Sequence, residues 1–314
     1  MSWRVLVSAP YMQKVLDRFR PIFDEHDIEV IVPLVNERLS EEDLLQWVGK
    51  VDGVICGDDP FTEQVLQKAR QLKVISKWGT GIDSIDLASC KRLGIAVRNT
   101  PNAFSEPVAD TVIGYILCFA RQIPWMNQDM KTGKWYKRSG KSLRECTLGI
   151  IGVGNIGRVV VRRALAFDMQ VLGNDIVELS QEFITETDIK MLTKEELLNR
   201  ADFVSLNCDL NSTSFHLISD KELSLMKPTA VLINTARGPV VNEIALIRAL
   251  QQKQIAGAAL DVFEEEPLPE DSTLLKMDNV LLAPHNANNS TEAWEYVHQN
   301  TIRNLLEVFE RGKK

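Results

Sequence analysis

The sequence lacks the patterns that mark several classes of protein. Its net charge is −7 and no basic stripe or arm is present to neutralise phosphates, so we expect no nucleic-acid partner. The longest apolar stretch, Val112–Ala120, contains Gly114 and is far too short to span a bilayer, so we expect no membrane partner. The start, Met1–Arg4, has no signal-peptide layout. No repeat or low-complexity segment is visible.

Paired cysteines are also missing. The five cysteines are scattered, odd in number and without a CxxC motif, which is typical of reduced thiols in a cytoplasmic protein. The composition, 45% hydrophobic and 25% charged, is that of a soluble globular protein. A length of 314 residues is long for one core and comfortable for two domains.

The first hundred residues alternate short β-branched segments with amphipathic ones. Five strands with four intervening helices predict a small parallel sheet that is covered on both faces. A linker at Asn99–Asn102 and a long helix from Ser105 to about Gln122 follow, and then a second βαβ series. The expected strands of the first series are Val5–Ser8, Glu29–Val32, Gly53–Cys56, Lys73–Ser76 and Ile95–Arg98.

A glycine motif opens the second series. Gly152-Val153-Gly154-Asn155-Ile156-Gly157 follows the apolar run Leu148–Ile151 and begins a helix. Gly152 permits a tight turn, Gly154 leaves room for a pyrophosphate, and Gly157 lets the helix lie close to its sheet. The helix from about Asn155 would point its free N–H groups, including those of Asn155 and Ile156, at the phosphates. The motif therefore predicts a dinucleotide site.

An acid in the expected place strengthens this interpretation. Asp175 closes the next strand, Gln170–Asn174, about 20 residues after the motif, where a carboxylate accepts hydrogen bonds from a ribose diol. A carboxylate there would repel a 2′-phosphate, so NAD is predicted in preference to NADP.

Three polar residues follow strands of the second series: Arg237 after Asn234-Thr235-Ala236, Glu266 before Pro267, and His285 after Pro284. With them, the chain resembles the D-isomer-specific 2-hydroxyacid dehydrogenase family, of the phosphoglycerate dehydrogenase and hydroxypyruvate or glyoxylate reductase type. The resemblance covers nearly the whole chain. It rests on Lys77–Asp86, Asn99–Pro101, the glycine motif, Asn234–Gly238 and Ala259–Pro267.

The resemblance implies an NAD-dependent oxidoreductase that interconverts a small D-2-hydroxy acid and its 2-oxo acid by hydride transfer. His285 would be the acid/base, since an imidazole titrates near neutrality. Glu266 would fix its tautomer, and Arg237 would hold the substrate carboxylate with a planar fork. Of the four histidines, only His285 follows a strand end and a proline.

The resemblance also implies supporting residues. Thr80 and Gly81 would offer backbone N–H groups to the substrate carboxylate. Lys77 stands where some members carry a cation for a phosphate or second acid, and an ordinary surface lysine is the alternative. Asp261 would contact the nicotinamide carboxamide, and the remaining cofactor-binding residues would be Asn207, Cys208, Thr235 and Ala236. No metal is expected.

The implied fold is α/β with two domains, a Rossmann-type NAD-binding domain (residues 103–287) inserted into a discontinuous, flavodoxin-like substrate domain (1–102 plus 288–314). The active site is expected in the cleft between them. Family members usually dimerise, so we expect a homodimer, and the helix at Val108–Ala120 would serve either as its interface or as domain core. Trp135 and Tyr136 would either border the site or pack in the core, and core packing is the favoured use.

Departures from the family pattern leave alternatives open. His285 is followed by Asn286-Ala287-Asn288-Asn289 rather than a glycine pair, and Asn207–Asn211 replaces the commoner His-x-Pro-Leu-Thr. A sugar acid or another atypical substrate is one alternative. A protein that only senses NAD(H), like corepressors of this fold, is the other.

Overall fold

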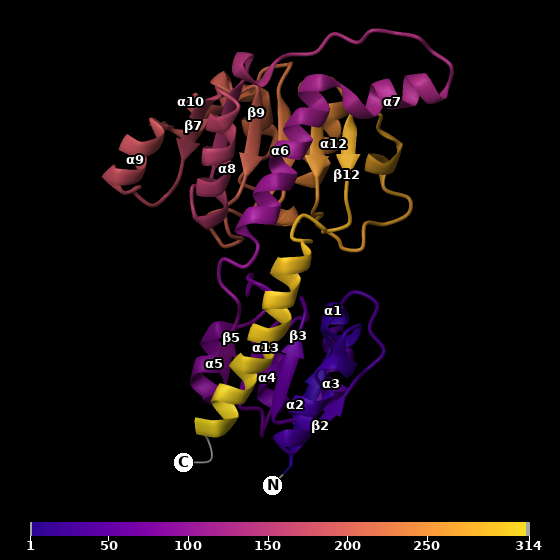
Figure 1. Cartoon of the computed structure of the whole chain (residues 1–314), viewed down its shortest axis with the longest axis vertical. Coiled ribbons are helices and arrows are strands. Elements are labelled where there is room, and N and C mark those ends of the chain that lie inside the picture. Colours follow the sequence, from indigo (N-terminus) through magenta and orange to yellow (C-terminus); the bar gives the residue numbers. More distant parts are fainter. Residues whose placement is uncertain (1, 312–314) are drawn as a thin grey trace. The chain divides into compact units, whose positions relative to one another are not determined.

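The structure is a computed structural model that describes residues 2–311 (Figure 1). The chain divides into two compact units. Unit 1 comprises Met1–Phe104 and Ser290–Lys314, and unit 2 comprises Ser105–Asn289. Each unit is a parallel sheet with helices packed on it, so the α/β prediction is confirmed.

Unit 1 contains a five-stranded sheet in the order β2-β1-β3-β4-β5, with every pair parallel. This is the flavodoxin-like order, in which ligands bind at the carboxyl ends of the strands. The strands are β1 (Trp3–Val7), β2 (Ile28–Ile31), β3 (Gly53–Cys56), β4 (Val74–Lys77) and β5 (Ala96–Arg98). The helices are α1 (Pro10–Gln13), α2 (Arg20–Glu25), α3 (Glu41–Trp47), α4 (Glu63–Lys68), α5 (Leu87–Leu93) and α13 (Thr291–Arg311).

The connection between β1 and β2 differs from the prediction of four intervening helices. It contains two short helices, α1 and α2, and each has a proline in its first turn. Proline lacks an N–H group and is tolerated only in the first turn of a helix, where Pro10 of α1 and Pro21 of α2 both lie.

The C-terminal helix α13 belongs to unit 1. It packs on β3, β4 and β5, as the yellow helix in Figure 1 shows. Ser76 Oγ donates a hydrogen bond to the carbonyl oxygen of Thr301 (2.8 Å), and the rings of Trp3 and Phe309 stack with centroids 4.5 Å apart. The two ends of the chain therefore build one core.

Unit 2 contains a seven-stranded sheet in the order β12-β11-β10-β9-β6-β7-β8, again parallel throughout. Its strands are β6 (Thr147–Ile151), β7 (Gln170–Asn174), β8 (Lys190–Met191), β9 (Phe203–Leu206), β10 (Val231–Asn234), β11 (Gly257–Leu260) and β12 (Val280–Leu282). Its helices are α6 (Ser105–Arg121), α7 (Ile123–Lys131), α8 (Asn155–Ala166), α9 (Gln181–Thr187), α10 (Lys194–Arg200), α11 (Asp220–Leu225) and α12 (Glu243–Gln251). The two-residue strand β8 was not predicted.

Two apolar clusters cover the two faces of this sheet. One includes side chains of α6 and α8, and the other includes side chains of α10 and α12. Val112 and Ile116 of α6 are fully buried in the first cluster, so the apolar face of this helix is domain core. Its use as a dimer interface is thereby excluded for those side chains.

The prediction of core packing for Trp135 and Tyr136 is wrong. Their exposed fractions are 85% and 66%, because they lie in the segment that follows α7 and leaves the sheet. No element packs over them within their own unit. Burial was predicted because the two side chains are aromatic, but the segment that carries them does not pack on the sheet.

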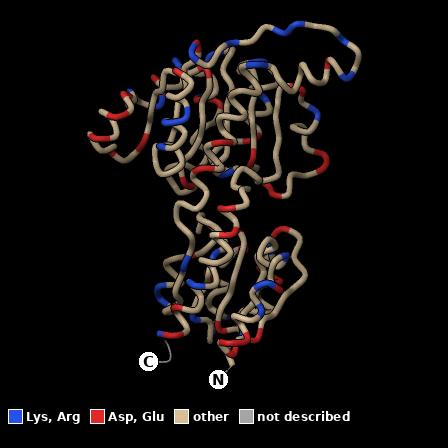
Figure 2. The backbone as a smooth tube through the Cα atoms, in the orientation of Figure 1, with Lys and Arg blue, Asp and Glu red and all other residues tan. Residues whose placement is uncertain are grey.

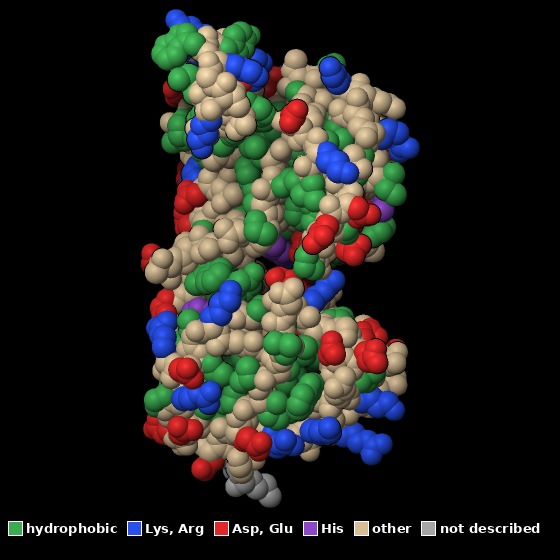
Figure 3. All heavy atoms as spheres, turned by 90° about the vertical axis from the view of Figure 1, so that its right-hand side faces the viewer, with side chains coloured by type: hydrophobic (Ala, Val, Ile, Leu, Met, Phe, Trp, Pro, Cys, Tyr) green, Lys and Arg blue, Asp and Glu red, His purple; other side chains and the backbone are tan. Residues whose placement is uncertain are grey.

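Basic and acidic residues are both scattered along the backbone of each unit (Figure 2). On the face drawn in Figure 3, apolar side chains are interrupted by charged and polar ones. Among the described helices, none combines the length and the apolar character needed to cross a bilayer.

Candidate active site

The glycine loop lies between β6 and α8 in unit 2. Gly152 has φ = 89°, a conformation that favours glycine, and a Cβ there would lie 2.6 Å from the backbone nitrogen of Cys208. A Cβ at Gly157 would overlap the Gly152 carbonyl oxygen. At Gly154, by contrast, a Cβ would meet no described atom within 4 Å. The loop is thus closed on its inner side and open where a pyrophosphate would approach.

Helix α8 begins directly at this opening. Its N-cap is Gly154, which provides no side chain to satisfy the first N–H groups, including those of Asn155 and Ile156. Unsatisfied N–H groups and the helix dipole favour an anion at this position. The sequence places no acid in the first turn that would compete for them.

Asp175 follows β7 and is fixed beside the glycine loop. Its two carboxylate oxygens accept hydrogen bonds from the backbone N–H groups of Val153 (2.6 Å) and Val177 (2.9 Å). The carboxylate is therefore held rigidly, and its remaining lone pairs are available for a diol.

Residues after β9 and β10 continue the same edge of the sheet. Asn207 donates its backbone N–H to Ile151 at 2.8 Å, which ties the end of β9 to the end of β6. The hydroxyl of Thr235 is buried and, within residues 2–311, has no hydrogen-bond partner. A buried hydroxyl without a hydrogen-bond partner costs stability. Cys208 and Ala236 complete this edge, and burial raises the pKa of the Cys208 thiol to about 11.

Glu266 and His285 lie together. Nδ1 of His285 is 2.9 Å from Oε2 of Glu266, while Oε1 of Glu266 accepts from the backbone N–H of Phe263 at 3.0 Å. Both side chains are about three-quarters buried. Because the carboxylate accepts, the hydrogen bond assigns the proton to Nδ1.

Asp261 holds the turn that carries His285. Its carboxylate accepts from the N–H groups of Asn286 (2.8 Å) and Ala287 (2.9 Å), and its carbonyl oxygen accepts from the N–H of His285 (2.8 Å). Burial raises the pKa of Asp261, and the two backbone hydrogen bonds act in the opposite direction. The asparagine-rich stretch after His285 thus supplies the N–H groups that clamp this turn.

Arg237 lies in the turn after β10. Asn234 shapes the turn, since its side chain donates to the carbonyl oxygen of Arg237 (2.9 Å) and accepts from the N–H of Ala236 (3.1 Å). A Cβ at Gly238 would overlap the carbonyl group of Phe263, so the Arg237 turn packs directly against the segment that leads to Glu266. Arg237, Glu266 and His285 therefore follow the adjacent strands β10, β11 and β12 at one edge of the sheet.

The predicted substrate residues of unit 1 follow β4. Gly79, with φ = 126°, opens the loop that contains Thr80 and Gly81, and Asn99 Nδ2 donates to the Thr80 carbonyl oxygen at 2.6 Å. Within the described part of the chain, the backbone N–H groups of Thr80 and Gly81 donate to no acceptor. Two free N–H groups in one loop form a concavity that suits an anion.

Lys77 is buried at the end of β4 and forms an ion pair with Asp58, with Nζ and Oδ1 2.9 Å apart. Sequence reasoning missed Asp58. Two aspartates after a strand carry no signal of their own, and nothing in the sequence indicates that one of them faces a residue of the next strand.

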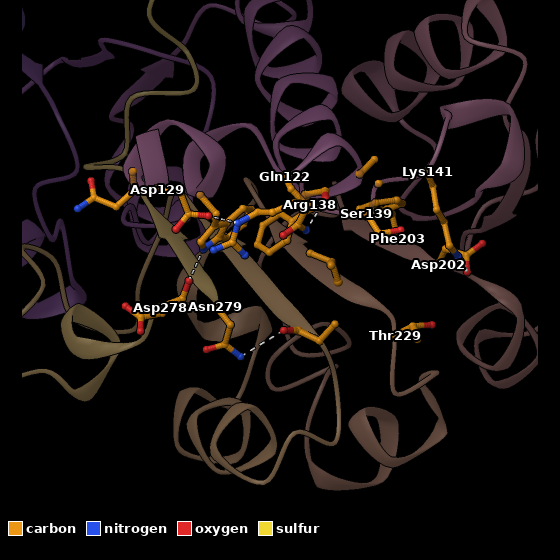
Figure 4. Close-up of a pocket in the computed structure, with 17 residues that line it drawn as sticks. Gln122, Asp129, Arg138, Ser139, Lys141, Asp202, Phe203, Thr229, Asp278 and Asn279 are labelled. Atoms are coloured by element: carbon orange, nitrogen blue, oxygen red, sulfur yellow. Dashed lines mark hydrogen bonds and ion pairs between the residues drawn. The ribbon is translucent and has the colours of Figure 1, made fainter. Parts of the chain in front are cut away.

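A cavity of about 660 Å³ lies at the other edge of the unit 2 sheet (Figure 4). It is lined by residues at the amino ends of strands, such as Phe203 and Val231, and by Asp129 and Arg138, whose side chains form an ion pair of 2.7 Å. None of the predicted site residues lines it. Among residues 2–311, no cluster of three or more potential ligands suits a metal ion.

Known proteins resemble this chain along most of its length. Residues 113–287 match the family model of the D-isomer specific 2-hydroxyacid dehydrogenase, NAD binding domain. The glyoxylate reductase of Thermofilum pendens is 38% identical over 86% of this chain and 81% of its own length. The D-3-phosphoglycerate dehydrogenase of Methanocaldococcus jannaschii is 37% identical over 92% of this chain, which spans only 54% of that protein.

A solved structure shares the fold. The D-lactate dehydrogenase of Aquifex aeolicus, complexed with NAD and lactic acid, superposes with a TM-score of 0.88 at 29% identity, covering 98% of this chain and 96% of that one. The glycine loop, the open start of α8 and the fixed Asp175 fit an NAD-binding domain. The chain therefore belongs to the D-isomer specific 2-hydroxyacid dehydrogenase family and is an NAD-dependent oxidoreductase of D-2-hydroxy acids.

Proposed function

We propose that Arg237, Glu266 and His285 are the catalytic residues for the interconversion of a small D-2-hydroxy acid and its 2-oxo acid. The observation that carries this proposal is the 2.9 Å hydrogen bond between Nδ1 of His285 and Glu266. With Nδ1 bonded to Glu266, Nε2 would give a proton to a ketone oxygen in reduction and take one from a hydroxyl in oxidation.

Glu266 has a double task in this proposal. Its charge favours the imidazolium form of His285 that reduction requires, and its hydrogen bond fixes the ring orientation. The bond from Phe263 N–H to its second oxygen keeps the carboxylate in place. Arg237 would bind the substrate carboxylate through its planar fork and polarise the neighbouring carbonyl group.

We further propose that unit 1 binds the substrate through Lys77 and the N–H groups of Thr80 and Gly81, while unit 2 holds NAD. When bound, NADH supplies the hydride. The cofactor contacts would come from Gly152, Gly154 and the start of α8, from Asp175 to the ribose, and from Asn207, Cys208, Thr235, Ala236 and Asp261. The free N–H groups of the Gly79–Gly81 loop and the orphaned Thr235 hydroxyl support these assignments.

Homodimer formation and a cytoplasmic location are proposals of the same kind. The family resemblance supports the first, and the five cysteines, all free in the described structure, support the second. Light scattering of the purified protein at micromolar concentration tests the dimer.

The test of the function is His285→Ala with NADH and a panel of hydroxypyruvate, glyoxylate and phosphohydroxypyruvate. We expect kcat/KM to fall by roughly 10²–10⁴-fold, the contribution of a general acid/base. The matched control is His26→Ala, because His26 lies on unit 1, where its Nδ1 is 2.9 Å from the carbonyl oxygen of Ile22 and its Nε2 is 3.8 Å from Oε1 of Glu310. Equal activity without His285 would contradict the proposal, and tight NADH binding without turnover of any acid would favour an NAD(H) sensor.

A further inference from the structure

The environment of Lys77 in unit 1 bears on the choice of substrate. The residue is only 4% exposed and its ammonium group contacts Asp58 at 2.9 Å. A Cβ at Gly79 would lie 3.7 Å from Lys77 Nζ, so the ammonium group lies against the glycine that opens the Gly79–Gly81 loop. The Lys77–Asp58 pair therefore adjoins the loop that we assign to the substrate carboxylate.

A second carboxylate lies close by. Asp59 is fully buried and accepts hydrogen bonds from Ser8 Oγ (2.7 Å) and from the N–H groups of Leu39 (2.6 Å) and Gly57 (3.0 Å). Burial raises its pKa, and nearby Lys77 acts in the opposite direction. These bonds fix the turn after β3 from which Asp58 reaches Lys77. Asp59 thus holds the turn that places Asp58 beside the ammonium group of Lys77.

This charge balance separates two kinds of substrate. A phosphate group needs an excess of positive charge, and here the only cation of the pair already has a counter-ion. An uncharged hydroxyl is amphoteric, so it can accept from Lys77 Nζ and donate to the Asp58 carboxylate at the same time. The side chain of Asp58 is 43% exposed, whereas that of Lys77 is only 5% exposed.

We propose that Asp58 is a specificity-determining residue: by pairing with Lys77, it selects a 2-oxo or 2-hydroxy acid with an uncharged hydroxyl group beyond C2 and rejects the phosphorylated counterpart. This inference rests on the proposed function and on the assignment of Lys77 to the substrate. By this inference, the substrate preference of the chain differs from that of the relatives named D-3-phosphoglycerate dehydrogenase. The sequences of those relatives are about as similar to this chain as the sequence of the glyoxylate reductase is.

The test compares kcat/KM for hydroxypyruvate and for phosphohydroxypyruvate with saturating NADH. We expect the wild type to prefer hydroxypyruvate. Asp58→Asn, which removes the charge and keeps an acceptor, should shift the ratio toward the phosphorylated acid by about tenfold, since it unmasks Lys77. Asp58→Glu keeps the charge and should preserve the wild-type preference.

The matched control is Asp24→Asn, which removes the same charge from an exposed position on α2, next to the amino end of β2 and thus at the other edge of the sheet. Screening should leave its ratio within about twofold of the wild type. Thermal melting of every variant reports any loss of folding separately from the ratio.

An unchanged ratio in Asp58→Asn, with or without a lower melting temperature, would overturn the inference and leave the pair a purely structural one. A wild type that prefers phosphohydroxypyruvate would overturn it as well. In both cases turnover persists and the proposed function stands. Absence of turnover with every 2-oxo acid would instead overturn the proposed function together with this inference.

Discussion

Replacing Glu266 by glutamine tests the proposed chemistry most directly, because the change is isosteric and the carboxylate makes two identified hydrogen bonds. One oxygen accepts from Phe263 N–H and the other from His285 Nδ1. An amide has only one accepting atom. If that oxygen stays with Phe263, the amide nitrogen faces Nδ1 and forces the proton of the neutral imidazole onto Nε2. If the amide oxygen turns to His285 instead, the amide N–H of the glutamine faces the backbone N–H of Phe263, and both are donors.

Both outcomes cost activity. Losing a charge-assisted hydrogen bond, about 1.5–3 kcal/mol, corresponds to about 10–100-fold in rate. Holding the imidazole in the wrong tautomer raises the loss toward about 10⁴-fold, as in hydrolase triads. We therefore expect kcat/KM for the reduction of a 2-oxo acid to fall by about 10²–10⁴-fold. As the pH rises, the variant should also lose its reducing activity at a lower pH than the wild type does, because no carboxylate favours the imidazolium form of His285.

The assay is NADH oxidation across pH 5.5–9 for the wild type, Glu266→Gln and Glu265→Gln. Glu265 is the matched control, because it is the adjacent glutamate and is exposed. A Glu266→Gln enzyme with wild-type rates and the wild-type pH profile would refute the reasoning. A pH profile that shifts equally in both variants would show that only the net charge matters.

Three further predictions concern packing, pH and the cofactor. Gly238→Ala should lower kcat/KM and cost about 1–3 kcal/mol of unfolding free energy in urea, because the added Cβ overlaps the Phe263 carbonyl group. The control Gly114→Ala, where the added Cβ meets open space on α6, should be neutral or stabilising. Burial lowers the pKa of His298, whose Nδ1 accepts from Trp78 Nε1 at 2.9 Å. The unfolded chain therefore takes up a proton near pH 6.5 that the folded chain resists, and stability should fall as the pH drops from 7 to 5. His298→Asn, which keeps an acceptor, should reduce that fall in melting experiments, and an unchanged pH dependence would contradict the assignment. Asp175→Ala should raise kcat/KM for NADPH relative to NADH by about tenfold or more, because it removes a charge that repels a 2′-phosphate, and a constant ratio would speak against this role.

The family and the α/β class were predictable because their signals are local. Gly152 permits a tight turn, Gly154 leaves room for a pyrophosphate, and Gly157 lets the helix lie close to its sheet. All three roles involve only one strand and the helix after it. Short apolar strands alternating with amphipathic helices similarly predicted parallel sheets. The placement of polar residues after strands then pointed to one edge of the second sheet, where Arg237, Glu266 and His285 indeed follow neighbouring strands. Their roles remain predictions that the variants above test.

Other features depend on segments that meet only after folding. The aromatic character of Trp135 predicted burial, but burial depends on what packs above a segment, and nothing in the sequence specifies that. Likewise, the apolar face of α6 fits a core or an interface equally well, and only its position against the sheet identifies it as core. Asp261 drew attention as a cofactor contact, whereas the structure adds that it clamps the turn of His285.

The sequence by itself thus determined the fold class, the cofactor and the candidate acid/base, since each rests on the order of residues within one or two adjacent elements. Only the tertiary structure decided which charges face one another. From the sequence alone, Lys77 is a candidate cation for a phosphate. In the structure it forms an ion pair with Asp58, which lies in the turn after the neighbouring strand β3. The physical reason is that electrostatic free energy depends on distance in space, and side-by-side packing of β3 and β4 brings together charges that the sequence keeps apart.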